Sequence, residues 1–334
     1  MEEKIILSHG DGGKFTSTLI NELFYKYYGN EILLKGGDSA VFSVKTRRRL
    51  AFSTDSFVIK PLFFQGGDIG KLAVCGTIND LAVSGAKPLY LSAGFIIEEG
   101  FSIGDLEVIV RSMGDICRET GTMIITGDTK VVEKGDADGL FINTAGVGVI
   151  ENRYMPKKIK NGDRIIITGS IAEHGTAITL ERYKIKAAGS FGSDCGSVYN
   201  IISSLAPFYK GIKLMRDPTR GGVAAALNEI SALAGKGIRI YENLIPIRKE
   251  VIAVCNILGL DPLYLASEGR AILAVDPSMS HEILKCIRSC ENGKDASIIG
   301  SFCDSCSNLV YLETEVGGRR LLNTLEAPML PRIC

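Results

Sequence analysis

The sequence LYLSAGFII, residues Leu89–Ile97, is an apolar run with the length of a buried β-strand. A helical pattern over Ile103–Glu119 follows it, and a second strand-like run, Met123–Thr126, comes next. A strand, a helix and a strand in succession predict an α/β layer, in which helices cover a sheet.

The same alternation continues on both sides of this unit. Towards the N-terminus we expect strands at Ala40–Val44 and Arg49–Ser53 and helices at Thr16–Tyr27 and Ile69–Ser84, with a further strand at Gly139–Ile150. The polar stretch Asn152–Pro156 then reads as a linker. Beyond it, strands are predicted at Arg164–Thr168, Ile238–Tyr241, Ala271–Val275 and Val310–Glu313, and helices at Thr176–Glu181, Val198–Ala206, Gly222–Leu233 and Ser280–Cys290.

These elements predict an α/β protein (α+β type) built from two α/β domains. We divide its 334 residues into a glycine-rich N-terminal segment with a helix (1–35), an N-terminal domain (36–151), a C-terminal domain (152–325) and a flexible tail (326–334).

Composition excludes several classes of function. Lys and Arg together number 38, as do Asp and Glu, so the formal net charge of zero gives no general attraction to nucleic acid or an anionic membrane. No apolar run approaches the roughly 18 residues of a membrane span. The start, Met1-Glu2-Glu3-Lys4, lacks the features of a signal peptide. We therefore expect a cytoplasmic protein with mostly reduced cysteines.

Four segments place an aspartate beside turn residues at strand ends. Carboxylates in such loops can converge on one point, and oxygen ligands suit Mg²⁺ with a phosphate substrate. Taken singly, an aspartate before a helix is most often an N-cap. Together the four favour a metal–phosphate site formed by Asp38, Asp55, Asp80 and Asp217.

Two further segments offer groups for a phosphate. Lys130, in Thr126-Gly127-Asp128-Thr129-Lys130, could neutralise a transferring phosphoryl group, although alone it reads as a solvated surface lysine. The start Gly10-Asp11-Gly12-Gly13-Lys14 could wrap N–H groups around phosphate. It is not a Walker motif, because Ser8 stands where that motif needs glycine, and Phe15 excludes the dinucleotide fingerprint.

The last residue, Cys334, ends a tail whose two prolines keep it extended. From Pro328 that tail can reach at most roughly 20 Å. A terminal thiol on such a tail suits a swinging covalent carrier, and its alternative is an exposed residue without a role.

The other cysteines and the histidines leave alternatives open. The spacing of Cys286, Cys290, Cys303 and Cys306 allows a structural zinc, a disulfide or unpaired thiols. His174 lies in a turn leading into a helix and favours a structural role, and His9 adjoins the glycine-rich start, where an indirect nucleotide contact is conceivable.

Five motifs follow one another along the chain: Gly37–Ala40, Thr54–Ser56, Asn79–Ala82, Gly127–Thr129 and Asp217–Gly222. In this order they resemble the aminoimidazole ribonucleotide synthetase superfamily, whose members activate a substrate oxygen with ATP. The resemblance covers essentially the whole chain. Its most specific element, the ending Pro331-Arg332-Ile333-Cys334, is similar to the carbamoyl dehydratases of hydrogenase maturation.

The resemblance implies a homodimer whose N-terminal domains pair into a β-barrel, with ATP in the cleft. It also implies roles for single residues. Cys334 would carry the carbamoyl group, Glu268 would accept a proton and Lys130 would lie near the reaction centre. Asp38, Asp55, Asp80 and Asp217 would contact Mg²⁺, and the nucleotide contacts would be Gly12, Gly13, Asp38, Asp55, Asn79, Asp80, Gly127, Asp128 and Thr129.

The implied reaction is ATP-dependent dehydration of an S-carbamoyl group on Cys334 to a thiocyanate, the source of cyanide ligands for [NiFe]-hydrogenase. HypF would donate the carbamoyl group, and a HypC–HypD complex would accept the cyanide. The alternatives are a sibling enzyme acting on a free small molecule, of the selenophosphate synthetase or thiamine-monophosphate kinase type, and a cysteine-based metal-binding protein. The sequence leaves open whether the tail acts in its own subunit or in the other.

Overall fold

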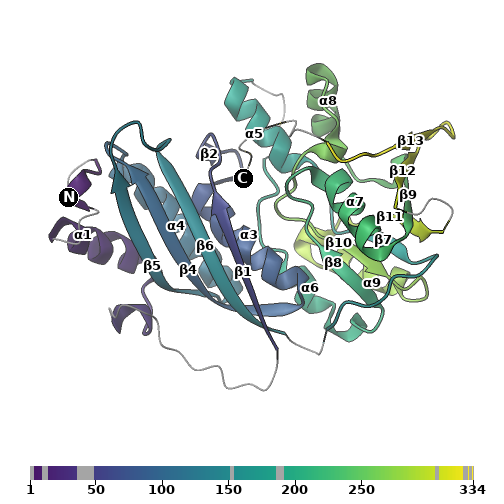
Figure 1. Ribbon diagram of the computed structural model, residues 1–334, viewed down its shortest axis with the longest axis horizontal. Helices are drawn as coiled ribbons and strands as arrows, with labels where there is room; N and C mark the ends of the chain where they lie inside the picture. The colour runs from purple at the N-terminus through teal and green to yellow at the C-terminus, as the bar shows by residue number, and fades with distance from the viewer. Residues whose placement is uncertain are drawn as a thin grey trace.

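The structure is a computed structural model that describes residues 4–9, 14–35, 49–150, 154–185, 192–304, 308–325, 330 and 333. Within these residues the chain forms two units that lie side by side, each a sheet with helices (Figure 1). The predicted strand Ala40–Val44 lies outside the described residues.

The first unit is a four-stranded sheet with the strand order β1-β6-β4-β5. Strand β6 pairs antiparallel with β1 and with β4, whereas β4 and β5 run parallel. The strands are β1 (Leu50–Phe57), β4 (Ala86–Glu98), β5 (Met123–Val132) and β6 (Leu140–Ile150), and a small hairpin adds β2 (Phe63–Phe64) and β3 (Gly67–Asp68).

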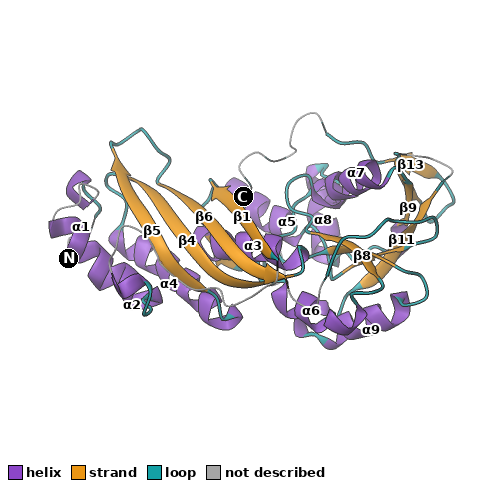
Figure 2. Cartoon of the chain, turned by 60° about the horizontal axis from the view of Figure 1, so that its bottom comes forward, coloured by secondary structure: helices purple, strands orange, loops and turns teal. Residues whose placement is uncertain are grey.

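Two helices, α3 (Ile69–Val83) and α4 (Ile103–Thr120), cover one face of this sheet (Figure 2). Helix α3 begins where the Asp68 carboxylate accepts hydrogen bonds from the first-turn N–H groups of Gly70 and Lys71. Burial alternates along the strands, so that Leu91, Phe95 and Ile97 of β4 face the helices. This core fixes β1 and α3 against each other, and both carry residues of the site.

The opposite face of the sheet is apolar and exposed. Phe52 of β1 is 72% exposed, and Leu50 on the same strand and Ile96 on β4 are exposed as well. No described helix covers this face, which looks toward the viewer in Figure 2. Exposed apolar surface of this kind marks an interaction site more often than a free surface.

The N-terminal helical segment packs on the outer end of this unit. It runs as α1 (Lys14–Leu19), a π-helical turn η2 (Ile20–Phe24) and α2 (Tyr25–Tyr28), in agreement with the predicted helix Thr16–Tyr27. The ring of Phe24 lies 5.0 Å from that of Phe95. Short 3-10 turns flank the segment at η1 (Leu7–His9) and η3 (Leu33–Lys35).

The second unit has a seven-stranded sheet with the order β13-β12-β9-β11-β7-β10-β8. Its pairs are antiparallel except β12 with β9, which is parallel. The strands are β7 (Arg164–Ile167), β8 (Ile212–Arg216), β9 (Gly237–Tyr241), β10 (Ile272–Val275), β11 (Ser297–Cys303), β12 (Val310–Glu313) and β13 (Arg319–Leu321).

Five described helices accompany this sheet: α5 (Glu173–Tyr183), α6 (Tyr199–Ser204), α7 (Gly222–Ala234), α8 (Lys249–Leu258) and α9 (Ser280–Ser289). The connections contain the 3-10 turns η4 (Ala206–Phe208), η5 (Glu242–Leu244), η6 (Pro262–Tyr264) and η7 (Glu291–Gly293). No helix in the described ranges has the length and apolar character needed to cross a bilayer.

Every element predicted within the described residues is present, with ends shifted by a few residues. Strands β2, β3, β8, β11 and β13 and helix α8 were not predicted. Helix α5 begins three residues before the predicted Thr176, so His174 lies in its first turn rather than in the preceding loop.

Candidate active site

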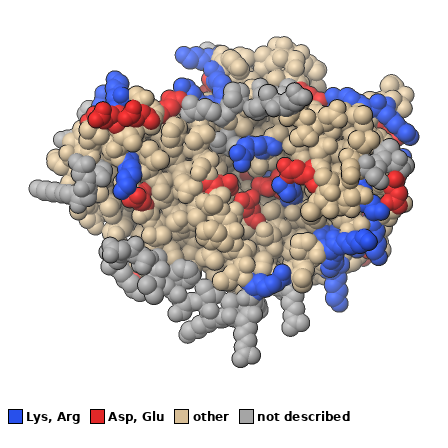
Figure 3. All heavy atoms as spheres, viewed as in Figure 1, with Lys and Arg blue, Asp and Glu red and all other residues tan. Residues whose placement is uncertain are grey.

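A cleft of about 240 Å³ lies between the two units. Figure 3 shows acidic and basic side chains gathered in the hollow at the centre of this face. The cleft is lined by Asp55, Ser56, Phe57, Gly76, Asp80, Arg216, Asp217, Thr219, Arg220, Ala226, Glu229 and Glu268. Three of the four predicted metal ligands therefore line one cavity, and Asp38 lies outside the described residues.

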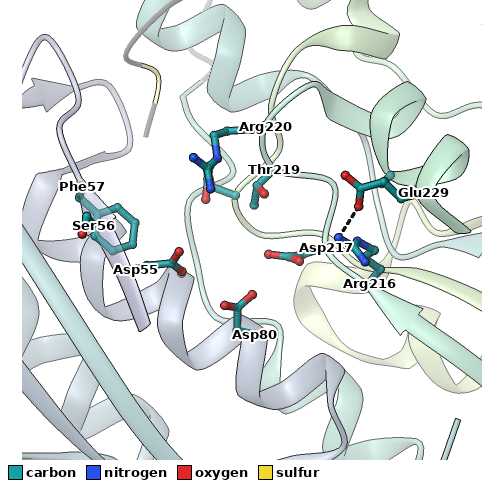
Figure 4. Close-up of a pocket in the computed structure, with 12 residues that line it drawn as sticks. Asp55, Ser56, Phe57, Asp80, Arg216, Asp217, Thr219, Arg220 and Glu229 are labelled. Atoms are coloured by element: carbon teal, nitrogen blue, oxygen red, sulfur yellow. Dashed lines mark ion pairs between the residues drawn. The ribbon is translucent and has the colours of Figure 1, made fainter. Parts of the chain in front are cut away.

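The three aspartates come from different elements and point toward one another (Figure 4). Asp55 is on β1, Asp80 is on α3, where it accepts a 2.5 Å hydrogen bond from the Ser53 hydroxyl, and Asp217 follows β8. Burial, and then the charge of Asp80, raises the pKa of Asp55. Burial and the charges of Asp80 and Asp55 raise the pKa of Asp217 to about 7. The protein thus concentrates negative charge at a point where a cation would relieve repulsion.

Positively charged side chains line the cleft as well. Arg216 of β8 is paired with Glu229 of α7 on one side of it, as the dashed line in Figure 4 marks. Arg220 lines the same cavity, and its charge lowers the pKa of Asp55 against the larger effect of burial. Among the described residues, no three His, Cys, Asp or Glu side chains are close enough to form a ready metal site.

Glu268 is the most deeply buried acid of the cleft, at 2% exposure. Its Oε1 has no hydrogen-bond partner among the described residues. Burial, followed by the charges of Asp217 and Asp194, raises the pKa of Glu268 well above the usual range. A carboxyl group held in this way binds a proton more tightly than an exposed glutamate does.

Asp194, which the sequence did not single out, fixes the backbone around Glu268. Its side chain is fully buried, and Oδ1 accepts hydrogen bonds from the N–H groups of His174 (3.0 Å) and Glu268 (3.3 Å). Oδ2 accepts from the Gly269 N–H (3.2 Å) and lies 3.6 Å from Arg270 Nε. No spacing or composition pattern marks this aspartate, because its donors lie 20 to 75 positions away.

Asn79 ties the two units together at the same place. Its amide donates to the carbonyl oxygens of Gly196 (3.1 Å) and Glu268 (3.0 Å), and its side-chain oxygen accepts from Val198 N–H (2.8 Å). The side chain is buried on α3. In the described chain this residue, predicted to contact the nucleotide, joins α3 to the loops that carry Glu268.

The predicted site residues on β5 lie away from this cleft. Lys130 and Asp128 are exposed and form an ion pair of 3.4 Å, and neither lines the cleft. Strands β4 and β6 separate β5 from β1. Gly127 packs against β4, where an added Cβ would lie 2.4 Å from the Ala93 carbonyl oxygen. A single chain therefore does not bring Lys130, Gly127, Asp128 and Thr129 to the acidic cluster.

The end of the chain is anchored close to Glu268. Ile333 is 8% exposed, and its carbonyl oxygen lies 2.8 Å from His174 Nε2. Leu330 is buried in the same core as Ile333. The other predicted functional residues of the termini, Gly12, Gly13 and Cys334, lie outside the described residues.

The described members of the C-terminal cysteine group carry free thiols. Cys286 of α9 and Cys290, which follows the helix, both lie near the Ser204 hydroxyl, at 3.6 and 3.5 Å. Cys303 on β11 is also free, and Cys306 lies outside the described residues. Cys75 is buried within α3.

Comparison with known proteins agrees with this architecture. Residues 36–150 match the AIR synthase related protein N-terminal domain, and residues 160–312 match the C-terminal domain of the same family. The carbamoyl dehydratase HypE of Bradyrhizobium diazoefficiens is 46% identical over 331 residues, covering 98% of this chain and 95% of that protein.

Two solved structures are also similar. A crystal structure of hydrogenase maturation protein HypE in complex with ATP superposes with a TM-score of 0.94 at 41% identity, covering 98% of this chain and 99% of that one. A crystal structure of a HypE–HypF complex gives a TM-score of 0.79 at 44% identity, covering 92% and 99%. The chain therefore belongs to the HypE family of AIR synthase-related proteins.

Proposed function

We propose that this protein catalyses the ATP-dependent dehydration of an S-carbamoyl group on Cys334 to a thiocyanate. The observation that carries the proposal is the anchoring of Ile333 at His174, because His174 and the buried acid Glu268 donate their N–H groups to the same oxygen of Asp194. The chain thus holds the residue next to Cys334 beside a deeply buried acid. The HypE relatives and the ATP complex of one of them support the same reaction.

The chemistry requires a better leaving group than hydroxide. Transfer of the terminal phosphoryl group of ATP to the carbonyl oxygen of S–CO–NH₂ releases ADP and makes that oxygen part of a phosphate. The C–O bond then breaks, phosphate leaves with the bonding electrons, and the nitrogen gives up both protons. The products are S–C≡N, ADP and phosphate, so the oxygen of the carbamoyl group ends in phosphate.

Glu268 suits the part of proton acceptor. Its Oε1 is free of hydrogen bonds within the described structure, and its backbone is fixed through the contacts to Asp194 and Asn79. Because burial raises the pKa of this carboxyl, its ionised form is a stronger base than an exposed glutamate. The raised pKa also means that ionisation of Glu268 needs positive charge nearby, which a cation bound at the aspartates of the cleft would supply.

The residues present fit a Mg²⁺ ion that arrives with the nucleotide. Asp55, Asp80 and Asp217 line one cleft with their oxygen donors, and burial followed by the neighbouring carboxylates raises the pKa of Asp55 and Asp217, a repulsion that a cation would balance. Mg²⁺ typically uses one or two carboxylates together with phosphates and water, so the cluster need not form a closed site by itself. When bound, the ion would neutralise charge on the phosphates, and Asp38 is the fourth ligand we propose.

We propose a homodimer that forms through the exposed face of the four-stranded sheet. Phe52, Leu50 and Ile96 are apolar and exposed there, as expected of an interface. Lys130 and Asp128, exposed on β5, would then serve the cleft of the second copy together with Gly127 and Thr129. Pairing through this face accounts for the distance between Lys130 and the acidic cluster within one chain.

Partners follow from the family. A HypE–HypF complex has been solved, and we propose HypF as the carbamoyl donor of this chain and a HypC–HypD complex as the cyanide acceptor. The proposed location is the cytoplasm. A selenophosphate synthetase is disfavoured because Cys75, the first cysteine, is buried within α3.

The test is intact-protein mass spectrometry after incubation with HypF, carbamoyl phosphate and ATP, followed by a Mg-ATP chase. We expect a carbamoyl adduct on the C-terminal peptide that loses one water during the chase. The Cys334→Ala variant should gain no adduct yet still bind ATP, and the Cys290→Ala control should behave as the unmodified protein. An adduct on another peptide, or one that persists through the chase, would overturn the proposal.

A further inference from the structure

His174 is fully buried and makes two hydrogen bonds through its ring. Nε2 lies 2.8 Å from the carbonyl oxygen of Ile333, and Nδ1 lies 2.8 Å from the Ser193 hydroxyl. A carbonyl oxygen only accepts, so Nε2 carries the hydrogen of the ring. Ser193 Oγ accepts from the N–H of Cys195 and is left to donate its own hydrogen to Nδ1. The network thus sets the tautomer that donates to the tail.

The surroundings of His174 form a socket for Ile333. The edge of the Phe64 ring packs against the imidazole, with ring centres 5.2 Å apart. Gly175, the next residue of α5, leaves room for the Ile333 side chain, because an added Cβ would lie 3.4 Å from Ile333 Cδ1 and 2.8 Å from Leu265 Cβ. The Ile333 side chain is buried in the socket, and Leu330 is buried just before it. Two of the tail's apolar side chains and one of its carbonyl groups are therefore held.

The same socket is connected to Glu268. Asp194 Oδ1 accepts from the N–H of His174 and also from the N–H of Glu268. Ile333 is covalently joined to Cys334 through the carbonyl group that His174 holds. A hydrogen bond at this carbonyl therefore fixes the peptide group that leads into the last residue relative to Glu268.

We propose that His174 is a positioning residue that holds the carbonyl group of Ile333 and so keeps the carrier end of the chain in its own subunit's active site during dehydration. The inference rests on the proposed function for its kinetic part. A carrier must also leave the site to be loaded, and a single hydrogen bond plus two apolar side chains is a contact weak enough to release. Release exposes the tail to HypF, and docking returns it to Glu268.

Two substitutions separate the tail contact from the rest of the network. In His174→Gln the side-chain amide nitrogen reaches about the position of Nε2 and can still donate to Ile333. In His174→Asn the shorter amide reaches about the position of Nδ1, so it keeps Ser193 and loses the tail. Ser193→Ala is the matched control on the other side of the ring, since it removes the Nδ1 partner and leaves the tail bond in place.

The first measurement does not depend on the reaction. The protein and its variants, all without a carbamoyl group, are treated with iodoacetamide. The rate of alkylation of Cys334 is followed on the C-terminal peptide by mass spectrometry. Losing one hydrogen bond to a buried donor shifts the docked tail towards release, so we expect about tenfold faster alkylation in H174N. The alkylation rates of H174Q and S193A should stay within about threefold of the rate of the protein without substitutions. Equal rates in H174N and the unmodified protein would overturn the proposal.

The second measurement tests catalysis with the tail already carbamoylated by HypF. In a single turnover with Mg-ATP, H174N should lose water about tenfold more slowly, while its ATP affinity and its melting temperature stay unchanged and its loading by HypF is no slower. H174Q should restore the rate. If H174N loses ATP affinity or melts early in step with the slower reaction, His174 is merely structural and the proposal fails. If the carbamoylated protein without substitutions shows no water loss, the proposed function fails. The alkylation result still decides whether His174 holds the tail.

Discussion

Replacing Asp194 with asparagine should weaken both the fold and the reaction. The carboxylate accepts three backbone hydrogen bonds, two at Oδ1 and one at Oδ2, where Arg270 also lies 3.6 Å away. An asparagine keeps one accepting oxygen, and its NH₂ group would face the N–H of Gly269 or those of His174 and Glu268. A buried donor without a partner costs about 1–3 kcal/mol, so D194N should lose about 2–4 kcal/mol with the weakened contact to Arg270.

That loss converts to a fall of about 5–15 °C in the melting transition of the C-terminal unit, taking about 2–4 °C per kcal/mol. Thermal unfolding by circular dichroism measures it. A shift of about 1 Å at Glu268 should also slow single-turnover dehydration about a hundredfold. Asp115→Asn is the control, because that aspartate is 59% exposed in its ion pair with Arg118 on α4 and should change stability by less than about 1 kcal/mol. Melting of D194N within about 2 °C of the unmodified protein, with the rate intact, would refute the reasoning.

Three further predictions concern the sheet face, the junction and a buried thiol. Phe52→Asp should give monomers with weakened ATP binding in light scattering and titration, whereas Val108→Asp, exposed on α4, should leave the dimer intact. Asn79→Ala removes three hydrogen bonds between the units and should lower the melting temperature and slow dehydration, while an unchanged melting temperature would contradict the role assigned to it. Burial raises the pKa of Cys117 to about 12, so the unfolded chain loses this thiol proton first and stability should fall as pH rises from about 9 to 12. The fall from this thiol is about 1.4 kcal/mol per pH unit, and Cys117→Ala should remove it in denaturant titrations under reducing conditions.

The elements that the sequence predicted are those whose stability is local. Helix α4 has an amphipathic pattern, an N-cap at Ser102 and Gly121 in the left-handed conformation (φ 67°) at its end, and each of these is visible in the sequence. Strand β4 is a long apolar run. Such features indicate directly which residues are buried and where an element ends, so the ranges of these two elements were predicted to within a few residues.

Strand β11 was missed because its sequence resembles a turn. Gly300 interrupts it, and glycine and serine are poor strand formers. The structure gives the reason for the glycine: an added Cβ would lie 2.1 Å from the carbonyl oxygen of Arg239 on β9. Close approach of a neighbouring strand is a long-range property, and nothing in the local sequence of β11 reports it.

The residues of the candidate site also fall into two groups, those with a local signal in the sequence and those defined by long-range contacts. The acids at strand ends were predicted because turn residues and carboxylates adjoin in the sequence, and Asp55, Asp80 and Asp217 do line one cleft. Asp194 and the tail contact of His174 were not predicted, since their partners are separated by 74 and 159 positions. A side chain whose function is to hold another segment has no signature of its own in a single sequence.

These long-range contacts decide how the two halves of the reaction are coupled. Asp55 and Asp80, which we propose for the nucleotide, belong to the first unit, whereas Glu268 and His174, which holds Ile333, belong to the second. Asn79 joins them, because it lies one residue before Asp80 and donates to the carbonyl oxygen of Glu268. A movement of α3 would therefore reach Glu268, which we propose as the proton acceptor, through the Asn79 side chain. In the proposed reaction, phosphoryl transfer and proton removal act on the same small group. The hydrogen bond from Asn79 to the Glu268 backbone keeps the residues for these two steps in a fixed relative position.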